Sequence, residues 1–238
     1  KELAHWNFDR VKEDAFAEWN RELGKITVEG GSEEEKIKFY TDLWHSLLGR
    51  HTFSDFNGKY IDNTGEEPVV RQVPLDNGTP TRNTYNSDAF WGSEFNLNIL
   101  WSIAYPKVMS EFVSTLVDYY TNGGMIARGP SGGNYTYVMV GDQATPLIAA
   151  AYNKGIRDFD IESAYQGCLK NSEPGGIRDY VGYKTNPGNF MQQYVDKGFV
   201  PEPTTKSPHA EGCAMTLYFA YEDWCMAQFA KGLEKEDV

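Results

Sequence analysis

Apolar side chains recur at helical spacing from the beginning of the chain. Gly30 and Gly31 interrupt this pattern. Ser32 with Glu35 then forms a capping-box signature for a second helix. Spacings of three or four residues predict one apolar face before the break and one after it. The first face consists of Phe8, Val11, Ala15, Trp19 and Leu23, and the second of Ile37, Tyr40, Trp44, Leu47 and Leu48.

The same spacing predicts helices over most of the remaining sequence. They cover residues 90–104, 107–121, 145–154, 161–170 and 213–233, with a short helix near 189–197. Pro106 separates the first two, because proline is not accommodated in a helix interior. Residues 51–82 differ, and Asn57-Gly58 between strand-forming residues predicts a β-hairpin. A mainly α fold of stacked antiparallel helix pairs follows, as in a bundle or an α/α toroid, with a small β-hairpin excursion.

Rings and polar side chains gather where the helix over residues 90–104 begins. Trp91, Glu94 and Asn96 lie within six residues there, beside two phenylalanines. A sugar has apolar ring faces and hydroxyl edges, which suit an aromatic ring flanked by carboxylate and amide groups. We therefore expect these three residues to bind carbohydrate. The apolar setting of Glu94 also suits a general acid, and the alternative is a polar helix residue that faces solvent.

A glycine-rich segment over residues 128–141 has the same polar and aromatic character. It is not a phosphate-binding P-loop, because no Gly-Lys-Ser/Thr follows. We expect Asn134 to contact the ligand, and Arg128 to orient the substrate or to hold the loop. Asp142 is a weaker candidate, since an acidic residue at a helix N-terminus is also favoured by the helix dipole.

The carboxylates of this chain do not form a recognisable catalytic pair. Glycoside hydrolysis needs two carboxyl groups, ~5–5.5 Å apart for retention or ~6.5–9.5 Å apart for inversion. Glu222 and Asp223 are adjacent on a predicted helix and point ~100° apart, so they cannot face each other across a bond. We expect structural hydrogen bonds from them.

Composition excludes several classes of function. The net charge of −12 argues against a nucleic-acid partner, and no apolar run approaches the ~20 residues of a membrane span. Neither the four histidines nor Cys168, Cys213 and Cys225 have metal-ligand spacing, so no metal site is predicted from the residues themselves. We expect buried or bystander thiols, because free cysteine tends to pack as a small apolar group.

Motifs spread over the chain resemble the catalytic domain of family 92 glycoside hydrolases, the calcium-dependent exo-acting α-mannosidases. The similarity extends from about Phe8 to Asp237, and the order and spacing of the pieces make it specific. The pieces are Phe39-Tyr40-Thr41 with Trp44-His45, Phe53-Ser54-Asp55-x-Asn57-Gly58-x-Tyr60, Phe90-Trp91-Gly92, Gly133-Asn134-x-Thr136-x-x-Met139-x-Gly141, Pro146-x-Ile148-x-x-Ala151-Tyr152-x-Lys154-Gly155-Ile156 and Thr216-Leu217-x-x-Ala220-Tyr221-x-Asp223-Trp224-Cys225.

The resemblance implies a periplasmic or secreted enzyme with an N-terminal β-sandwich and an (α/α)6 barrel, which removes terminal mannose from glycans with inversion. Residues 1–31 would be the linker helix and connection, and residues 32–238 the N-terminal half of the barrel. The general acid and base would lie in a segment after Val238, so that this chain alone is inactive. Calcium is implied, but no residue here can be assigned to it.

Some positions depart from the family pattern. Trp-Asp-Thr-x-Arg is replaced by Trp91-Gly92-Ser93-Glu94-Phe95, and Leu-Glu-Tyr by Leu217-Tyr218-Phe219. We hypothesise that Glu94 takes over hydroxyl recognition from the lost aspartate, and the sugar and linkage stay open. Two other interpretations are a non-catalytic carbohydrate-binding protein on a degenerate toroid, and an α/α-toroid enzyme such as a polysaccharide lyase. The acidic balance disfavours the lyase, whose chemistry needs a cationic cleft.

Overall fold

The computed structural model describes residues 5–87, 90–182, 187–202 and 212–235, and these form a mainly helical fold with short hairpins. The predicted helices are confirmed, with most ends within two residues of the expected positions. The α-helices are α1 (Phe8–Leu23), α2 (Glu33–Leu48), α3 (Leu97–Ala104), α4 (Pro106–Gly123), α5 (Ala144–Asn153), α6 (Ile161–Asn171), α7 (Phe190–Lys197) and α8 (Gly212–Gly232).

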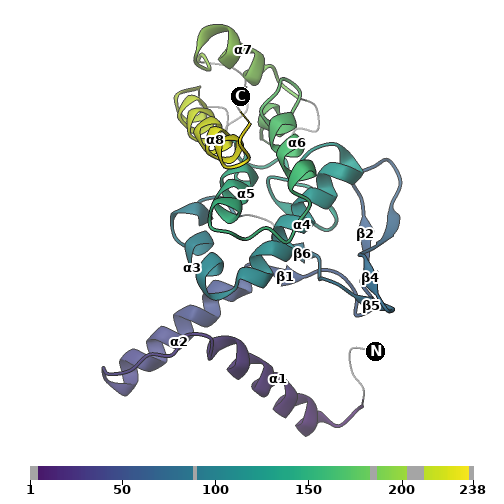
Figure 1. Ribbon diagram of the computed structural model, residues 1–238, viewed down its shortest axis with the longest axis vertical. Helices are drawn as coiled ribbons and strands as arrows, with labels where there is room; N and C mark the ends of the chain where they lie inside the picture. The colour runs from purple at the N-terminus through teal and green to yellow at the C-terminus, as the bar shows by residue number, and fades with distance from the viewer. Residues whose placement is uncertain (1–4, 88–89, 183–186, 203–211, 236–238) are drawn as a thin grey trace.

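Helices α1 and α2 form an arm that extends below the rest of the molecule (Figure 1). The predicted capping box is present at α2, where the side chains of Ser32 and Glu35 each accept a backbone N–H from the other residue. Trp19 meets Trp44 edge-on between the two helices, with ring centroids 6.2 Å apart. Helix α1 buries none of its residues, and Phe8 and Phe16 are exposed on it.

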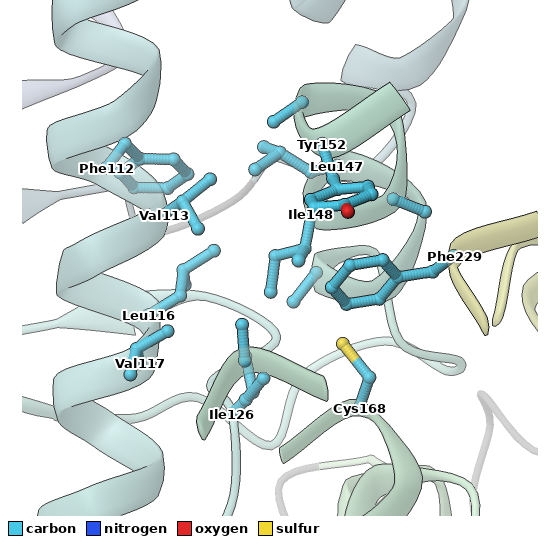
Figure 2. Packing of buried hydrophobic residues seen from close by; sticks show 14 of the residues in the cluster. Phe112, Val113, Leu116, Val117, Ile126, Leu147, Ile148, Tyr152, Cys168 and Phe229 are labelled. Atoms are coloured by element: carbon cyan, nitrogen blue, oxygen red, sulfur yellow. The ribbon is translucent and has the colours of Figure 1, made fainter. Parts of the chain in front are cut away.

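The other helices pack in two layers. In one layer α5 lies between α3 and α8, and in the other α4 packs against α6 (Figure 1). The main hydrophobic core fills the space between the layers, and Figure 2 shows Phe112 and Leu116 of α4 facing Ile148 of α5 and Phe229 of α8. Helix pairs layered in this way are the arrangement that the helical spacing predicts.

Four two-stranded antiparallel pairs make up the β structure. They are β1 (His51–Thr52) with β6 (Tyr85–Asn86), β2 (Lys59–Asp62) with β3 (Val69–Gln72), β4 (Leu75–Asp76) with β5 (Thr79–Pro80), and β7 (Pro130–Ser131) with β8 (Asn134–Tyr135). The hairpin predicted at Asn57-Gly58 is wrong. These residues form a turn, but the strand after it pairs with β3, because β1 before it is taken up by β6.

The Asn-Gly hairpin of this fold lies instead at Asn77-Gly78, between β4 and β5. Both residues have positive φ, 47° and 82°, as a two-residue hairpin turn of type I′ requires.

The helix predicted over residues 90–104 begins later, at Leu97. Gly92 has a φ of 80°, which a helix does not permit, and a 3-10 turn η1 (Ser93–Phe95) follows it. Asn96 then caps α3. The polar and aromatic residues at this position therefore lie on an irregular segment before the helix, where their side chains are displayed on the surface.

Candidate functional site

Trp91 stacks on Tyr218 of α8, and this pair is the centre of the candidate site. Their ring centroids are 5.5 Å apart and the planes are inclined by 17°. Trp91 remains 45% exposed, so one aromatic surface is open to a ligand. The sequence pattern predicts Trp91 as a site residue but not Tyr218, whose only signal is its departure from the Leu-Glu-Tyr pattern.

Glu94 lies half-buried beside this aromatic pair. Burial raises the pKa of its carboxyl, against smaller opposing effects from the backbone at Gly92 and Glu94 and from the Tyr218 side chain. Its Oε2 atom is enclosed and accepts no hydrogen bond from any described residue. An enclosed acceptor without a donor is costly, and a sugar hydroxyl could supply the donor only once the surrounding side chains move, because this oxygen has almost no accessible surface.

Gln143 adds a second enclosed acceptor next to Tyr218. Its Nε2 donates to the carbonyl of Val140 at 3.0 Å, while Oε1 has no partner within the described chain. The side chains of Tyr218 and Gln143 both lie against Gly141, which has a φ of 77° and no room for a Cβ. Nothing in the sequence alone indicated Gln143.

Asn96 and Asn134 are exposed, and each uses its side-chain oxygen locally. The Oδ1 of Asn96 accepts from the N–H of Leu97 at 2.6 Å, and the Oδ1 of Asn134 accepts from that of Tyr135 at 2.7 Å. Asn96 lies two residues from Glu94, whereas Asn134 belongs to the β7–β8 hairpin. Neither has a hydrogen bond to Trp91, Glu94 or Tyr218 in the part of the chain that the structure covers, so their sugar contacts stay predictions.

Arg128 is buried beneath the glycine-rich segment. Burial lowers the pKa of its guanidinium to about 10. All three of its nitrogens donate to backbone carbonyls, at distances of 2.6–3.1 Å, and Met139 among the acceptors has a strained φ of 66°. The acceptors are Val138, Met139, Gly141, Ile177 and Tyr180. This geometry fits the loop-holding role of the two that we predicted.

Asp142 is fully buried at the start of α5. Its Oδ2 accepts from the Thr145 hydroxyl at 2.6 Å, and its Oδ1 accepts from the N–H of Ala144 at 3.1 Å. These bonds cap the helix, which is the structural alternative to a ligand contact.

Behind Asp142 lies a buried group of charges. Glu222 accepts the backbone N–H of Asp142, and its Oε2 lies 3.1 Å from the Nε of Arg178. Arg178 also donates to Asp223 at 2.5 Å. Burial raises the pKa of Glu222 to about 8, even though the Arg178 cation opposes the shift. Both acidic neighbours on α8 thus have the structural roles expected of them.

Neither a catalytic pair nor a metal site is complete among the described residues. Asp142 and Glu222 are enclosed by the partners given above, which leaves Glu94 as the carboxylate at the aromatic pair. No group of three or more His, Cys, Asp or Glu side chains that could hold a metal ion occurs in the described ranges. No residue of the described ranges is therefore assigned to calcium.

The glycosyl hydrolase family 92 catalytic domain model matches residues 1–238 of this chain. The chain belongs to glycosyl hydrolase family 92. The resemblance seen in the sequence is thereby confirmed, and so is membership of a glycoside hydrolase family.

Solved family 92 structures have the same fold. A family 92 inverting mannosidase from Bacteroides thetaiotaomicron VPI-5482 matches with a TM-score of 0.82 and 25% identity, over 99% of this chain and 30% of that one. A family 92 α-mannosidase from Bacteroides thetaiotaomicron matches with a TM-score of 0.80 and 25% identity, over 99% of this chain and 29% of that one. This family 92 chain thus spans about 30% of the length of these solved relatives.

One curated relative is an uncharacterized secreted glycosidase of Arthroderma benhamiae. It is 23% identical over 246 residues, which are 98% of this chain and 25% of that protein. In the described part of our family 92 chain, every helix is too short or too polar to cross a membrane.

Proposed function

We propose that this chain forms one wall of the sugar pocket in an exo-acting, inverting α-mannosidase that removes terminal mannose from glycans. The observation that supports it most is the exposed Trp91–Tyr218 stack with the unpartnered carboxyl oxygen of Glu94 beside it, in a chain of family 92. Both solved relatives described above are mannosidases.

Each residue has a defined part in this proposal. Trp91 supplies a ring face for the sugar, and Glu94 accepts a hydroxyl. Asn96 and Asn134 bind at the rim, where they are exposed. Arg128 holds the loop, and Asp142 fixes the start of α5 behind the pocket.

The general acid and base belong, in this proposal, to a part of the enzyme outside these residues, as does any calcium site. Residues 1–31 are then the linker and 32–238 the first half of the (α/α)6 barrel. Exposed apolar side chains support this division. They are 59–76% exposed in the described chain, and they are Phe95, Ile103 of α3, and Leu217 and Trp224 of α8. Such faces mark contact surfaces. Secretion or periplasmic export is supported by the secreted relative.

The first prediction concerns Glu94 and Trp91. In the complete enzyme, Glu94→Gln is expected to weaken binding of methyl α-mannoside about tenfold, because it removes a charged acceptor, and Trp91→Ala by a similar factor. Titration calorimetry measures both. Phe56 is an exposed aromatic residue on the β-rich segment, so Phe56→Ala is the matched control and should leave the affinity for methyl α-mannoside unchanged. Unaltered affinity in both site variants would remove these residues from the pocket.

The second prediction separates the enzyme from a binding protein. The complete protein should release free mannose from α-mannosides, and the 238-residue chain, verified as folded by circular dichroism, should release none. Turnover by the short chain would require an acid and a base within it, which contradicts the proposed division. Sugar binding by the complete protein without turnover would favour a non-catalytic carbohydrate-binding protein, the alternative that the lost family residues support.

A further inference from the structure

Arg50 is a buried arginine between α2 and β1, in contact with the segment that carries the candidate sugar residues. Its side chain is only 4% exposed, and its guanidinium carbon lies 4.5 Å from the ring centroids of both Trp101 and Phe112. Aromatic faces attract a cation, and this attraction is strongest where water is excluded. The rings of α3 and α4 therefore fix the plane of this guanidinium.

One nitrogen of the group reaches the 3-10 turn and the helix after it. The Nη2 of Arg50 donates to the Oδ1 of Asn98 at 2.8 Å and lies 3.4 Å from the Oγ of Ser93. The hydroxyl of Ser93 also donates to the same Asn98 oxygen, at 3.0 Å. Arg50, Ser93 and Asn98 thus form a closed triangle, and all three are buried.

This triangle lies at the backbone that carries Trp91 and Glu94. We call these two residues, together with Tyr218, the sugar wall. Ser93 is preceded by Trp91 and the left-handed Gly92, and it is followed directly by Glu94. Trp91 and Glu94 are half-exposed, so little packing holds them except their contacts with Tyr218. Fixing Ser93 to α3 and to the end of α2 fixes the backbone that carries both side chains.

We propose that Arg50 is a positioning residue for the sugar wall: through Asn98 and Ser93 it holds the turn that places Trp91 and Glu94 against Tyr218. The inference rests on the proposed function for its consequence in sugar binding, but not for its geometry. Lysine cannot replace this arginine, because an ammonium lacks the flat guanidinium that lies against two rings while its Nη2 donates to Asn98.

The test uses the complete enzyme with Arg50→Lys and Asn98→Asp. Arg50→Lys should lower the affinity for methyl α-mannoside roughly tenfold, as expected when a charge-assisted hydrogen bond no longer holds the turn. It should also reduce the near-ultraviolet circular dichroism contributed by Trp91. This contribution is obtained separately for the wild type and for Arg50→Lys, each time as the spectrum with Trp91 minus the spectrum of the same protein carrying Trp91→Ala, so that changes at Trp101 beside Arg50 cancel. Asn98→Asp keeps an oxygen acceptor for Arg50. It should preserve the affinity for methyl α-mannoside and the Trp91 circular dichroism to within about threefold. Unchanged affinity and spectrum in Arg50→Lys would overturn the proposal.

Loss of stability alone must be separated from loss of positioning. Phe229→Leu, in the core far along α8 from Tyr218, lowers the melting temperature without touching the triangle, and it should leave the affinity and the Trp91 spectrum unchanged. If the wild-type enzyme binds none of the α-glycosides of mannose, glucose or galactose, the proposed function fails. The Trp91 spectrum of Arg50→Lys still decides the positioning role in that case.

Discussion

Replacing Arg178 by methionine is expected to destabilise the folded protein by ~3–5 kcal/mol at pH 9, and by clearly less at pH 6. Arg178 has no exposed side-chain surface and lies between Glu222 and Asp223. Methionine removes the cation, so at pH 9 the enclosed Glu222 carboxyl either stays charged without a compensating charge or takes up a proton, and both cost free energy. The free energy of unfolding, from urea titrations at the two pH values, measures the effect.

The pH dependence follows from Glu222. Its folded-state pKa of about 8 is above the ordinary value of 4.5, so the folded state binds the proton more tightly than the unfolded chain. This group therefore contributes stability that is fully present below pH 4.5 and is lost as the pH rises towards 8. In the wild-type protein at pH 9, the Glu222 carboxyl is charged and the Arg178 cation stabilises it. At pH 6 the carboxyl carries a proton and needs no compensating cation.

Two variants serve as controls for Arg178→Met. Lys38→Met breaks an ion pair with Asp42 in which both side chains are mostly exposed, 76% and 62%, and it should leave the free energy of unfolding nearly unchanged at either pH. Combining Arg178→Met with Glu222→Gln removes the titrating group, so the extra cost at pH 9 should disappear. If the pH dependence persists in this double variant, Glu222 is not its source.

Replacing Arg128 by methionine is expected to lower the free energy of unfolding by ~3–5 kcal/mol, because buried hydrogen bonds are lost. Five backbone carbonyls from two separate segments lose their donor at once, and Met139 loses a contact that holds its strained backbone. Unfolding in urea measures the loss, and hydrogen exchange of the amides of residues 138–142 should speed up under conditions where the variant is still folded.

Arg128→Lys distinguishes the two roles that the sequence left open. A lysine keeps the charge and can bond to one or two of the carbonyls, so we expect an intermediate loss of stability. If Arg128 only holds the loop, sugar affinity should fall in step with the loop's protection from exchange. A large loss of affinity with a fully protected loop would instead indicate direct contact with the substrate.

The helices of this protein could be predicted because their signals are local. Spacing and the Ser32–Glu35 capping box depend on residues a few positions apart, and both are confirmed. The strand pairing could not be predicted in the same way. Asn57-Gly58 and Asn77-Gly78 have equal turn chemistry, and only the distant pairing of β1 with β6 decides which of them closes a hairpin.

One half of the candidate site was visible in the sequence for the same reason. Trp91 and Glu94 are close along the chain, so their joint character could be read directly. Tyr218 could not be found, since it meets Trp91 only after α8 has packed against α5. Gln143 joins the site only through Gly141 and Tyr218, which lie next to it in the folded chain. Arg50 was missed because a lone arginine at the end of an apolar helix is ordinarily solvated, whereas here two aromatic rings enclose it.

The stacking of Trp91 on Tyr218 makes the sugar wall a property of the whole fold. One ring precedes α3 and the other belongs to α8, so a chain whose last helix has come away from α5 has no wall. A ligand that binds the open face of Trp91 while this ring rests on Tyr218 binds the folded state alone and shifts the folding equilibrium by mass action. At a hundred times its dissociation constant it adds about 2.7 kcal/mol. Sugar in the surroundings would thus protect the protein from unfolding and from the proteases that attack opened chains.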